Sequence, residues 1–278
     1  MRARNAVAGV VILAAGWAVA PEALLAQTGQ SGTRRVNAEN RLFIRFVEDA
    51  AIVPSYWLEG QARYQGNLAA FDPNVSGAGE SDLLSAGGVF AFNVAEDFEF
   101  GARLAVARRE ADNNGSDTGL TDLDLWGKVS VVSDPVKISL GILLVAPTGD
   151  EDKFLGSGET NVEFFGGIRK DLTHVSLAAN AGFRINQDPD IEDLSGVEGK
   201  NSILLGGALL FPATQNLVLT AEYALETERF EGLKNDSRLL GGFEYRDGED
   251  LMWRGAIGGG LSDGAPDFEL LASVVWLF

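Results

Sequence analysis

Hydrophobic and polar residues alternate along most of the chain after residue 54, with the period of two that is typical of β-strands. In the stretch DFEFGARLAVAR (97–108), one face carries Phe98, Phe100, Ala102, Leu104 and Val106. Charged residues such as Glu99 and Arg103 fall on the other face. The pattern recurs in THVSLAANAGFRIN (173–186) and NLVLTAEYALE (216–226). It predicts a protein built almost entirely from β-strands.

The predicted strands are long, and their connections alternate in length. Most span 10–14 residues, whereas soluble strands average about 5–6 and a tilted membrane-spanning strand needs about 9–11. Short turns alternate with long or acidic connections near 72–79, 111–118, 149–158 and 187–200, as in outer-membrane barrels. The predicted fold is an all-β, transmembrane, antiparallel up-and-down β-barrel. Its twelve predicted strands lie near 54–66, 80–94, 97–109, 119–132, 136–148, 159–170, 173–186, 201–211, 216–227, 237–246, 250–262 and 267–278.

Charged residues concentrate on one phase of these runs, and the opposite phase is apolar. In a membrane barrel the charged phase lines the interior, or lumen, because an Arg or Lys facing lipid costs roughly 2–4 kcal/mol at mid-depth. An exported soluble β-sandwich would show the same alternation, so this pattern alone leaves both folds open. The candidate lumen-lining residues are Glu99, Arg103, Asp122, Asp124, Lys128, Glu163, Arg169, Arg184, Glu222, Arg238 and Arg254.

The placement of aromatic residues favours the barrel. A set of them lies in the apolar phase, near the short-turn end of the runs: Phe92, Phe98, Phe100, Phe211, Phe243, Tyr245, Trp253, Trp276 and Phe278. Aromatic side chains gather at membrane–water interfaces, whereas a sandwich core has no reason to sort them to one end. Trp276 and Phe278 would complete this ring on the last strand, which closes the barrel by pairing with the first.

The N-terminal residues predict export. MRAR is basic, NAVAGVVILAAGWAVA is apolar, and EALLA ends in small residues, as in a secretory signal peptide. We expect cleavage after Ala26, with Ala20 as a second position, and an uncleaved anchor is the alternative. Residues 1–26 are thus predicted as signal peptide, residues 27–53 as a periplasmic lead-in or a small plug, and residues 54–278 as the barrel.

Composition narrows the chemistry. The chain has no cysteine, one histidine and a formal net charge of −18, which excludes thiolate and His-rich metal sites and argues against nucleic acid as a partner. No cofactor is expected. His174 and Ser176 form a His-x-Ser pair of the kind outer-membrane phospholipases use. The pair falls in the lumen phase near a short turn, which disfavours a lipid hydrolase, and we expect no enzyme.

Three segments resemble a known family. GLTDLDLWGKV (119–129), APTGDEDKFLGSGETNVEFFGGI (146–168) and GLSDGAPDFELLASVVWLF (260–278) are similar to themes of outer-membrane transporters of the meta-pathway phenol-degradation type. The resemblance implies a barrel that moves small molecules, including apolar or aromatic ones. It also implies recognition of the terminal Phe278 by the barrel assembly machinery. In PTGD and DGAPD, turn formation alone explains the residue types.

The function predicted on this basis is passive transport of small molecules across the bacterial outer membrane, with the substrate unspecified. A closed structural or adhesive barrel is the alternative, because the acidic and basic lumen residues could pair across a narrow bore. Outer-membrane lipids and lipopolysaccharide are the expected partners. Acidic loops such as DEDK and DPDIED suggest contact with lipopolysaccharide through divalent cations.

Overall fold

The computed structural model describes residues 50–53, 56–68, 81–111, 115–190 and 197–278. The described residues all belong to one compact unit, Ala38–Phe278. The predicted signal peptide (1–26) and residues 27–49 of the predicted lead-in lie outside the described residues. Within the described part of the chain, no helix is long and apolar enough to cross a membrane.

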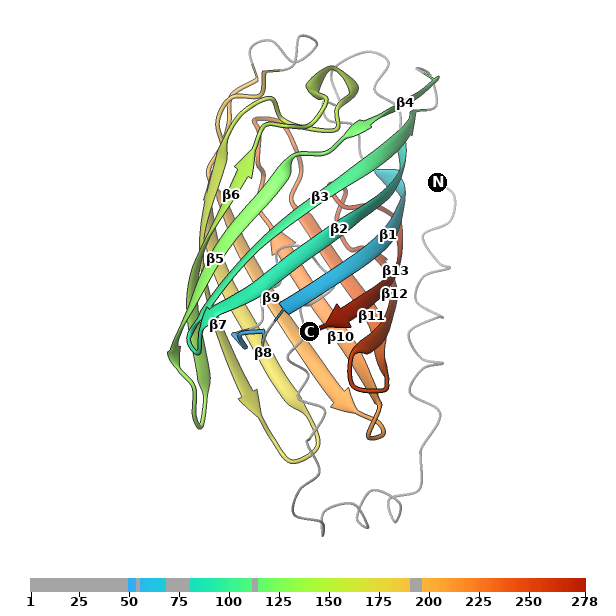
Figure 1. Cartoon of the computed structure of the whole chain (residues 1–278). Helices are drawn as coiled ribbons and strands as arrows, with labels where there is room; N and C mark the ends of the chain where they lie inside the picture. The colour runs from blue at the N-terminus through green and yellow to red at the C-terminus, as the bar shows by residue number, and fades with distance from the viewer. Residues whose placement is uncertain (1–49, 54–55, 69–80, 112–114, 191–196) are drawn as a thin grey trace. The chain divides into compact units, whose positions relative to one another are not determined.

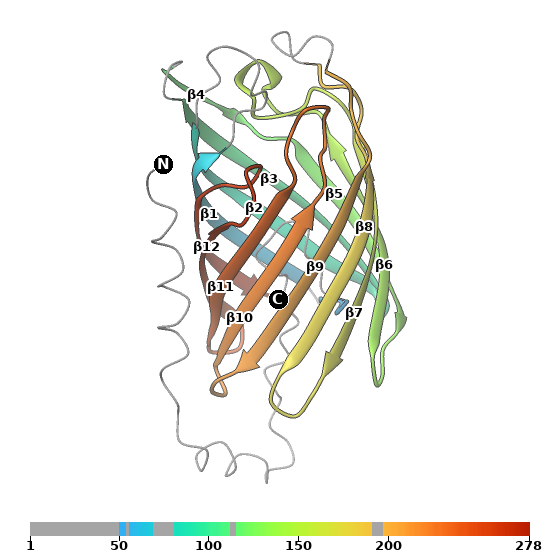
Figure 2. The same cartoon turned by 180° about the vertical axis from the view of Figure 1, so that it is seen from behind.

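A single antiparallel sheet of thirteen strands contains almost all of the described chain (Figures 1 and 2). The strands are β1 (Tyr56–Leu68), β2 (Ser81–Ala95), β3 (Phe98–Ala111), β4 (Gly115–Leu120), β5 (Leu123–Val132), β6 (Lys137–Ala146), β7 (Asn161–Asp171), β8 (Ser176–Ile185), β9 (Ser202–Pro212), β10 (Leu217–Glu226), β11 (Asp236–Asp247), β12 (Leu251–Gly260) and β13 (Phe268–Leu277). A short 3₁₀ helix, η2 (Glu151–Lys153), lies between β6 and β7.

The sheet closes on itself, because β1 pairs with both β2 and β13. Strand β3 pairs with β5 over its first half and with β4 over its second half. Strands β4 and β5 therefore occupy one position in succession, and the barrel has twelve positions. This confirms the predicted up-and-down barrel. Closure pairs the strands around the wall, and among the described strands only β4, at the loop end, has a strand partner on one side alone. Such pairing is the condition for burying backbone polar groups in lipid.

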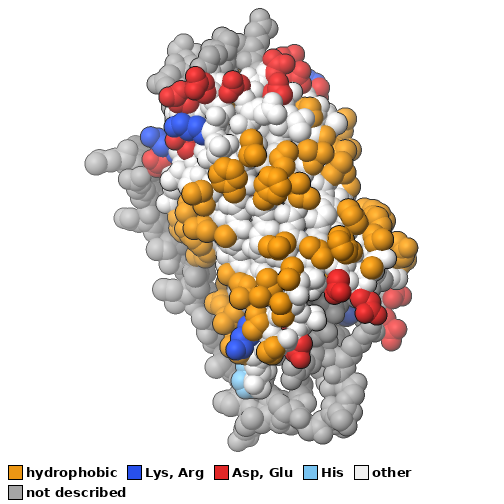
Figure 3. All heavy atoms as spheres, turned by 90° about the vertical axis from the view of Figure 1, so that its left-hand side faces the viewer, with side chains coloured by type: hydrophobic (Ala, Val, Ile, Leu, Met, Phe, Trp, Pro, Cys, Tyr) orange, Lys and Arg blue, Asp and Glu red, His pale blue; other side chains and the backbone are white. Residues whose placement is uncertain are grey.

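The two faces of each strand differ in exposure as the alternation predicts. Leu104 and Leu219 are 38% and 39% exposed, whereas Glu99 and Glu222 on the same strands are 0% and 1% exposed. The barrel thus turns its apolar phase outward and its charged phase inward. Figure 3 shows hydrophobic side chains spread over the wall, with charged side chains gathered near its two ends. A soluble sandwich would bury the apolar phase instead, so the exposure pattern is that of a membrane barrel.

The connections define two ends of the barrel. The turn end carries the short connections 96–97, 133–136, 172–175, 213–216 and 248–250, together with the start of β1 and the end of β13. The loop end carries longer connections, including 147–160, 186–201 and 227–235. One expectation needs correction. Residues 111–118 are not wholly a loop, because β3 and β4 remain paired as far as Ala111 and Gly115.

The aromatic residues of the turn end face outward, as predicted. Phe98, Phe100, Phe211, Phe243, Tyr245, Trp253 and Trp276 are each 41–47% exposed, and Phe278 is 70% exposed. Phe92 is partly buried, and its ring stacks on those of Tyr56 and Phe90 with centroids 6.3 and 5.4 Å apart. Stacking places these rings at one level of the wall, where a membrane interface favours them.

Candidate functional site

The inward face of the strands is the candidate site. Eight of the eleven predicted lumen-lining residues are buried there: Glu99, Asp124, Lys128, Glu163, Arg169, Arg184, Glu222 and Arg254. Arg103 and Arg238 are partly buried on the same face, with side chains 20% and 11% exposed. Asp122 lies elsewhere, between β4 and β5. A role for these side chains in conduction stays a prediction.

An apolar cluster lies on the inner face of the strands and extends from Trp57 and Val275 near the turn end to Val145 near the loop end of β6. It contains Val53, Trp57, Val89, Ala91, Trp126, Leu143, Val145, Phe165, Met252 and Val275. The indole N–H of Trp57 donates to Glu59 at 3.2 Å, and that of Trp126 donates to Glu99 at 3.0 Å. These hydrogen bonds fix both rings against the wall with their polar atoms satisfied. The sequence pattern missed this cluster because it sorted residues by charge.

Residues 50–53 lie inside the barrel at the turn end. The backbone N–H of Val53 donates to Glu99 at 3.0 Å, and the Lys128 ammonium donates to the carbonyl of Ala51 at 2.8 Å. Lys128 also pairs with Glu99 at 3.2 Å. The buried Lys128–Glu99 ion pair therefore holds residues 50–53 through the carbonyl of Ala51 and the N–H of Val53. The remaining part of the predicted lead-in or plug is not described, and the choice between those two roles stays a prediction.

Further ion pairs follow the inner wall. Arg254 on β12 bonds Glu244 on β11 at 2.9 Å and Glu59 on β1 at 2.9 Å. Arg184 on β8 bonds Glu163 on β7 and Glu226 on β10, each at 2.6 Å. These partners sit on adjacent strands or one strand further on. Each of these pairs therefore runs along the wall and does not reach across the lumen.

Several inward polar atoms have no hydrogen-bond partner among the described residues. They are Ser139 Oγ, Thr220 Oγ1, Ser273 Oγ and the Oε2 atom of Glu244. Buried polar groups are almost always satisfied by protein or by water. These atoms face the barrel interior, and each of them is almost inaccessible to solvent. In the sequence, the only sign that these hydroxyls face inward is their position on the inward phase of the strands.

Asp122 has a different environment from the strand residues. Its Oδ1 atom accepts the N–H of Gly149 at 3.0 Å, and its Oδ2 atom accepts the N–H of Ser157 at 3.1 Å. Both donors belong to the β6–β7 loop at the loop end of the barrel. The sequence pattern placed Asp122 with the lumen-phase residues because it read 119–132 as one continuous strand. The break between β4 and β5 instead directs its carboxylate to the loop.

The predicted His-x-Ser pair does not form a catalytic arrangement in the described chain. His174 is exposed in the β7–β8 turn, whereas Ser176 is buried at the start of β8. The Ser176 hydroxyl donates to Asp171 at 2.5 Å and accepts from Arg169 at 3.4 Å. Among the described residues, no group of three or more His, Asp or Glu side chains is placed to hold a metal ion.

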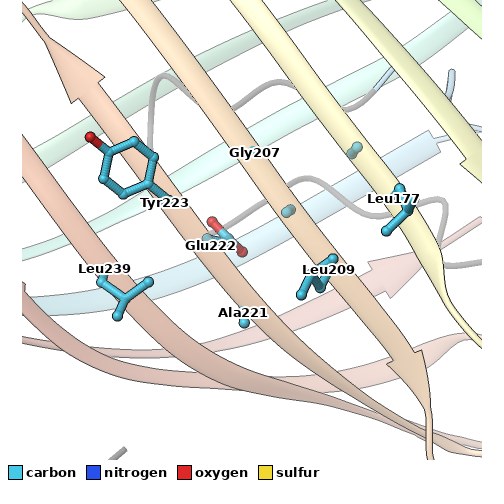
Figure 4. A pocket seen from close by; sticks show the side chains of 9 residues that line it. Leu177, Gly207, Leu209, Ala221, Glu222, Tyr223 and Leu239 are labelled. Atoms are coloured by element: carbon cyan, nitrogen blue, oxygen red, sulfur yellow. The ribbon is translucent and has the colours of Figure 1, made fainter.

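The outer wall has a shallow apolar hollow of about 330 Å³ over β8–β11. Figure 4 shows Leu177, Leu209, Tyr223 and Leu239 around the small residues of its floor, including Gly207. The four large side chains belong to the outward phase of the strands, so the hollow opens toward lipid. Its floor is shallow because Gly207 and Ala221 carry little or no side chain, and Glu222 is the one charged residue among the described residues of its lining.

Comparison with known proteins places the fold. No family model matches the chain, and no curated protein matches its sequence. Among solved structures, the COG4313 outer membrane channel from Pseudomonas putida F1 matches with a TM-score of 0.63 and 14% identity, covering 81% of this chain and 96% of that one. The NanC porin matches with a TM-score of 0.53 and 8% identity, covering 81% and 100%. At such identities the similarity shows a shared fold.

The closed barrel, its outward-facing apolar wall and its fold neighbours together define the class of protein. The chain is a twelve-position β-barrel of the bacterial outer membrane.

Proposed function

We propose that this barrel is a passive channel for small molecules. The observation that carries the proposal is the closed barrel itself, whose outer wall is apolar and whose inner wall carries charged and hydroxyl side chains. A polar interior of this kind is the usual lining of an outer-membrane channel. The fold that the chain shares with an outer membrane channel and a porin supports the same reading.

The course of the buried ion pairs also supports an open lumen. In a closed barrel, opposite charges would meet across the bore. Arg184 and Arg254 instead satisfy carboxylates on their own stretch of wall, at 2.6–2.9 Å. Charges that are neutralised along the wall leave a polar surface of low net charge. A solute meeting that surface is neither expelled nor trapped, which passive conduction requires.

We further propose that the cargo includes small aromatic or apolar molecules. The apolar cluster of the inner face contains three aromatic side chains, Trp57, Trp126 and Phe165, which are 1–5% exposed. Aromatic rings bind one another with about 0.5–1.5 kcal/mol beyond the effect of buried area. The resemblance to transporters of the meta-pathway phenol-degradation type points the same way. Weak binding of this size slows a solute without holding it.

Current block by an uncharged aromatic solute tests the cargo. In planar bilayers, benzamide should reduce the ion current, and Trp126→Ala should weaken this block by about 2–10-fold. Trp253→Ala is the matched control, because Trp253 is 47% exposed on the outer wall. A block that is equal in the two variants contradicts an aromatic cargo site. Absence of current in both the folded wild-type protein and the folded Lys128→Met variant contradicts the channel itself.

A closed structural barrel is the second candidate, and one observation favours it. Residues 50–53 lie in the lumen at the turn end, with Ala50, Ala51 and Val53 only 1%, 7% and 2% exposed. If this segment seals the barrel, the protein should not conduct until the segment is released. Lys128→Met removes the hydrogen bond to Ala51. A barrel that stays silent after this change, while still folded, supports the structural role.

The membrane setting implies further partners, which we also propose. The turn end faces the periplasm, and the loop end faces lipopolysaccharide. Outer-membrane lipids cover the apolar wall, and the barrel assembly machinery reads the exposed terminal Phe278. Divalent cations would bridge the acidic loops to lipopolysaccharide phosphates through exposed carboxylates. Chelator-sensitive binding of lipopolysaccharide to the purified barrel would test this last point.

A further inference from the structure

The β6–β7 loop, residues 147–160, packs against the inner side of the barrel mouth. Gly119 on β4 faces inward, because it pairs with Ala107, which is 1% exposed on the inner face of β3. A Cβ atom on Gly119 would collide with the Asp150 carboxylate of the loop. Asp150 also accepts the N–H of Leu120 at 3.2 Å. Figure 1 shows this loop in light green at the upper rim, near β4.

Asp122 clamps the two ends of this loop together. Its two carboxylate oxygens accept N–H groups from Gly149 and Ser157, at 3.0 and 3.1 Å. The glycines of the loop make the clamp possible. A Cβ on Gly149 would lie 2.9 Å from Asp122 Oδ1 and 2.9 Å from the Cα of Gly156, closer than real Cβ contacts. The PTG and LGSG segments thus bring two backbone stretches together around one carboxylate.

The clamped loop presents a strained aromatic residue to the inner wall. Phe154 has a φ of 56°, a left-handed conformation that a bulky residue adopts only when its surroundings impose it. Its ring lies 4.7 Å from the guanidinium carbon of Arg109, on the inward phase of β3. The next residue, Leu155, is 8% exposed. The loop therefore reaches from β6–β7 past β5 to the inner face of β3.

We infer that this loop is a size-limiting constriction at the outer mouth of the channel, and that Asp122 is the residue that sets it. The inference rests on the proposed channel function. With both ends clamped, Phe154 and Leu155 stay inside the rim and narrow the entrance. If the clamp is lost, the strained turn has no reason to keep its conformation, and the loop leaves the inner wall. Asp122 thus acts on permeation by positioning Phe154.

Two measurements on the full-length protein test this inference. The first is tryptic cleavage after Lys153, whose ammonium donates to the Thr118 carbonyl at 3.0 Å in the clamped loop. Asp122→Ala removes two hydrogen bonds to a charged acceptor. It should raise the released fraction, and with it the cleavage rate, about tenfold or more. Asp122→Asn keeps one acceptor oxygen, so its cleavage rate should lie between those of the wild type and Asp122→Ala. Cleavage after Lys234, in another loop, is the internal reference.

The second measurement is single-channel conductance. Asp152→Ala is the matched control, because it removes one carboxylate from the same loop at an exposed position. Asp122→Ala should increase conductance and the cut-off size of permeant solutes, and Asp152→Ala should change neither. Faster cleavage after Lys153 with unchanged conductance overturns the inference, because the loop is then free and the entrance is no wider. If the wild type and all variants are silent, the channel function fails, whatever the cleavage shows.

Discussion

Removal of Arg184 should destabilise the barrel strongly. Its guanidinium donates to Glu163 at 2.6 and 3.1 Å and to Glu226 at 2.6 Å. All three side chains are nearly inaccessible, at 2%, 2% and 6% side-chain exposure. Arg184→Met therefore leaves two carboxylates inside the barrel without their shared cation.

The size of the effect follows from the partners that remain. Glu226 keeps a second cation, Arg229, at 3.6 Å. Breaking a buried pair by removing one partner costs about 3–5 kcal/mol. Arg184→Met/Glu163→Gln removes one of the two carboxylate charges as well. The double variant should recover about 0.5–3 kcal/mol, the usual coupling between contacting residues.

Equilibrium unfolding in urea measures both quantities. The protein would be folded into phospholipid vesicles and followed by tryptophan fluorescence, with the four proteins of the cycle compared under one condition. A cost below about 1 kcal/mol for Arg184→Met would refute the reasoning, because exposed ion pairs contribute that little. The interior at this level would then behave as open water. Additive effects of the two substitutions would likewise show that the pair is uncoupled.

Three further predictions concern the wall, the entering segment and the loops. Leu219→Arg places a charge on the lipid face and should cost about 2–4 kcal/mol, whereas Thr220→Arg on the inner face should be tolerated better; equal costs in vesicle unfolding would contradict the assigned faces. Lys128→Met should release the segment before β1 and increase single-channel conductance, and an unchanged conductance in folded protein would argue against any narrowing there. At the loop end, the hydrogen bond from Lys200 lowers the pKa of Glu228 below its ordinary 4.5. This contact therefore stabilises the folded state fully above pH 4.5. The stabilisation is lost as pH falls through the lowered pKa of the folded state. Lys200→Ala should raise this pKa in an NMR titration, and an unchanged value would rule out the contact.

The fold could be predicted from the sequence because a barrel wall has only two sides. Each strand has one side toward lipid and the other toward the lumen, so the period of two identifies the face of every residue. The length of the runs then distinguishes membrane strands from soluble ones. By this rule Leu219 falls on the outward face and Glu222 on the inward face, and they are 39% and 1% exposed. The aromatic residues of the turn end followed from the same argument.

The site was less predictable, because its partners are set by register and by breaks in the strands. Nothing in the spacing of Arg254 and Glu59 along the chain shows that they meet at 2.9 Å. Their contact depends on closure between β1 and β13. Asp122 was read as a wall residue, because the strand break beside it leaves no mark in the alternation. Its role becomes clear only when Gly149 and Ser157 are seen to donate to it.

Charge at the loop end bears on the ion selectivity of the proposed channel. Asp150, Asp152, Asp188 and Asp190 lie in the connections at this end. Carboxylates raise the local cation concentration within a Debye length, about 8–10 Å at physiological salt. The balanced charge of the inner wall adds little to this. We therefore expect a modest preference for cations that weakens as salt rises.

Single-channel recording of the purified full-length protein in a planar lipid bilayer shows whether the barrel conducts ions. A salt gradient across the bilayer gives conductance and selectivity in one experiment. We predict a small, steady conductance with a reversal potential on the cation-selective side, as expected of a narrow bore with acidic loops at its mouth. Folded protein that inserts into the bilayer and passes no current, with Lys128→Met as silent as the wild type, would contradict this prediction.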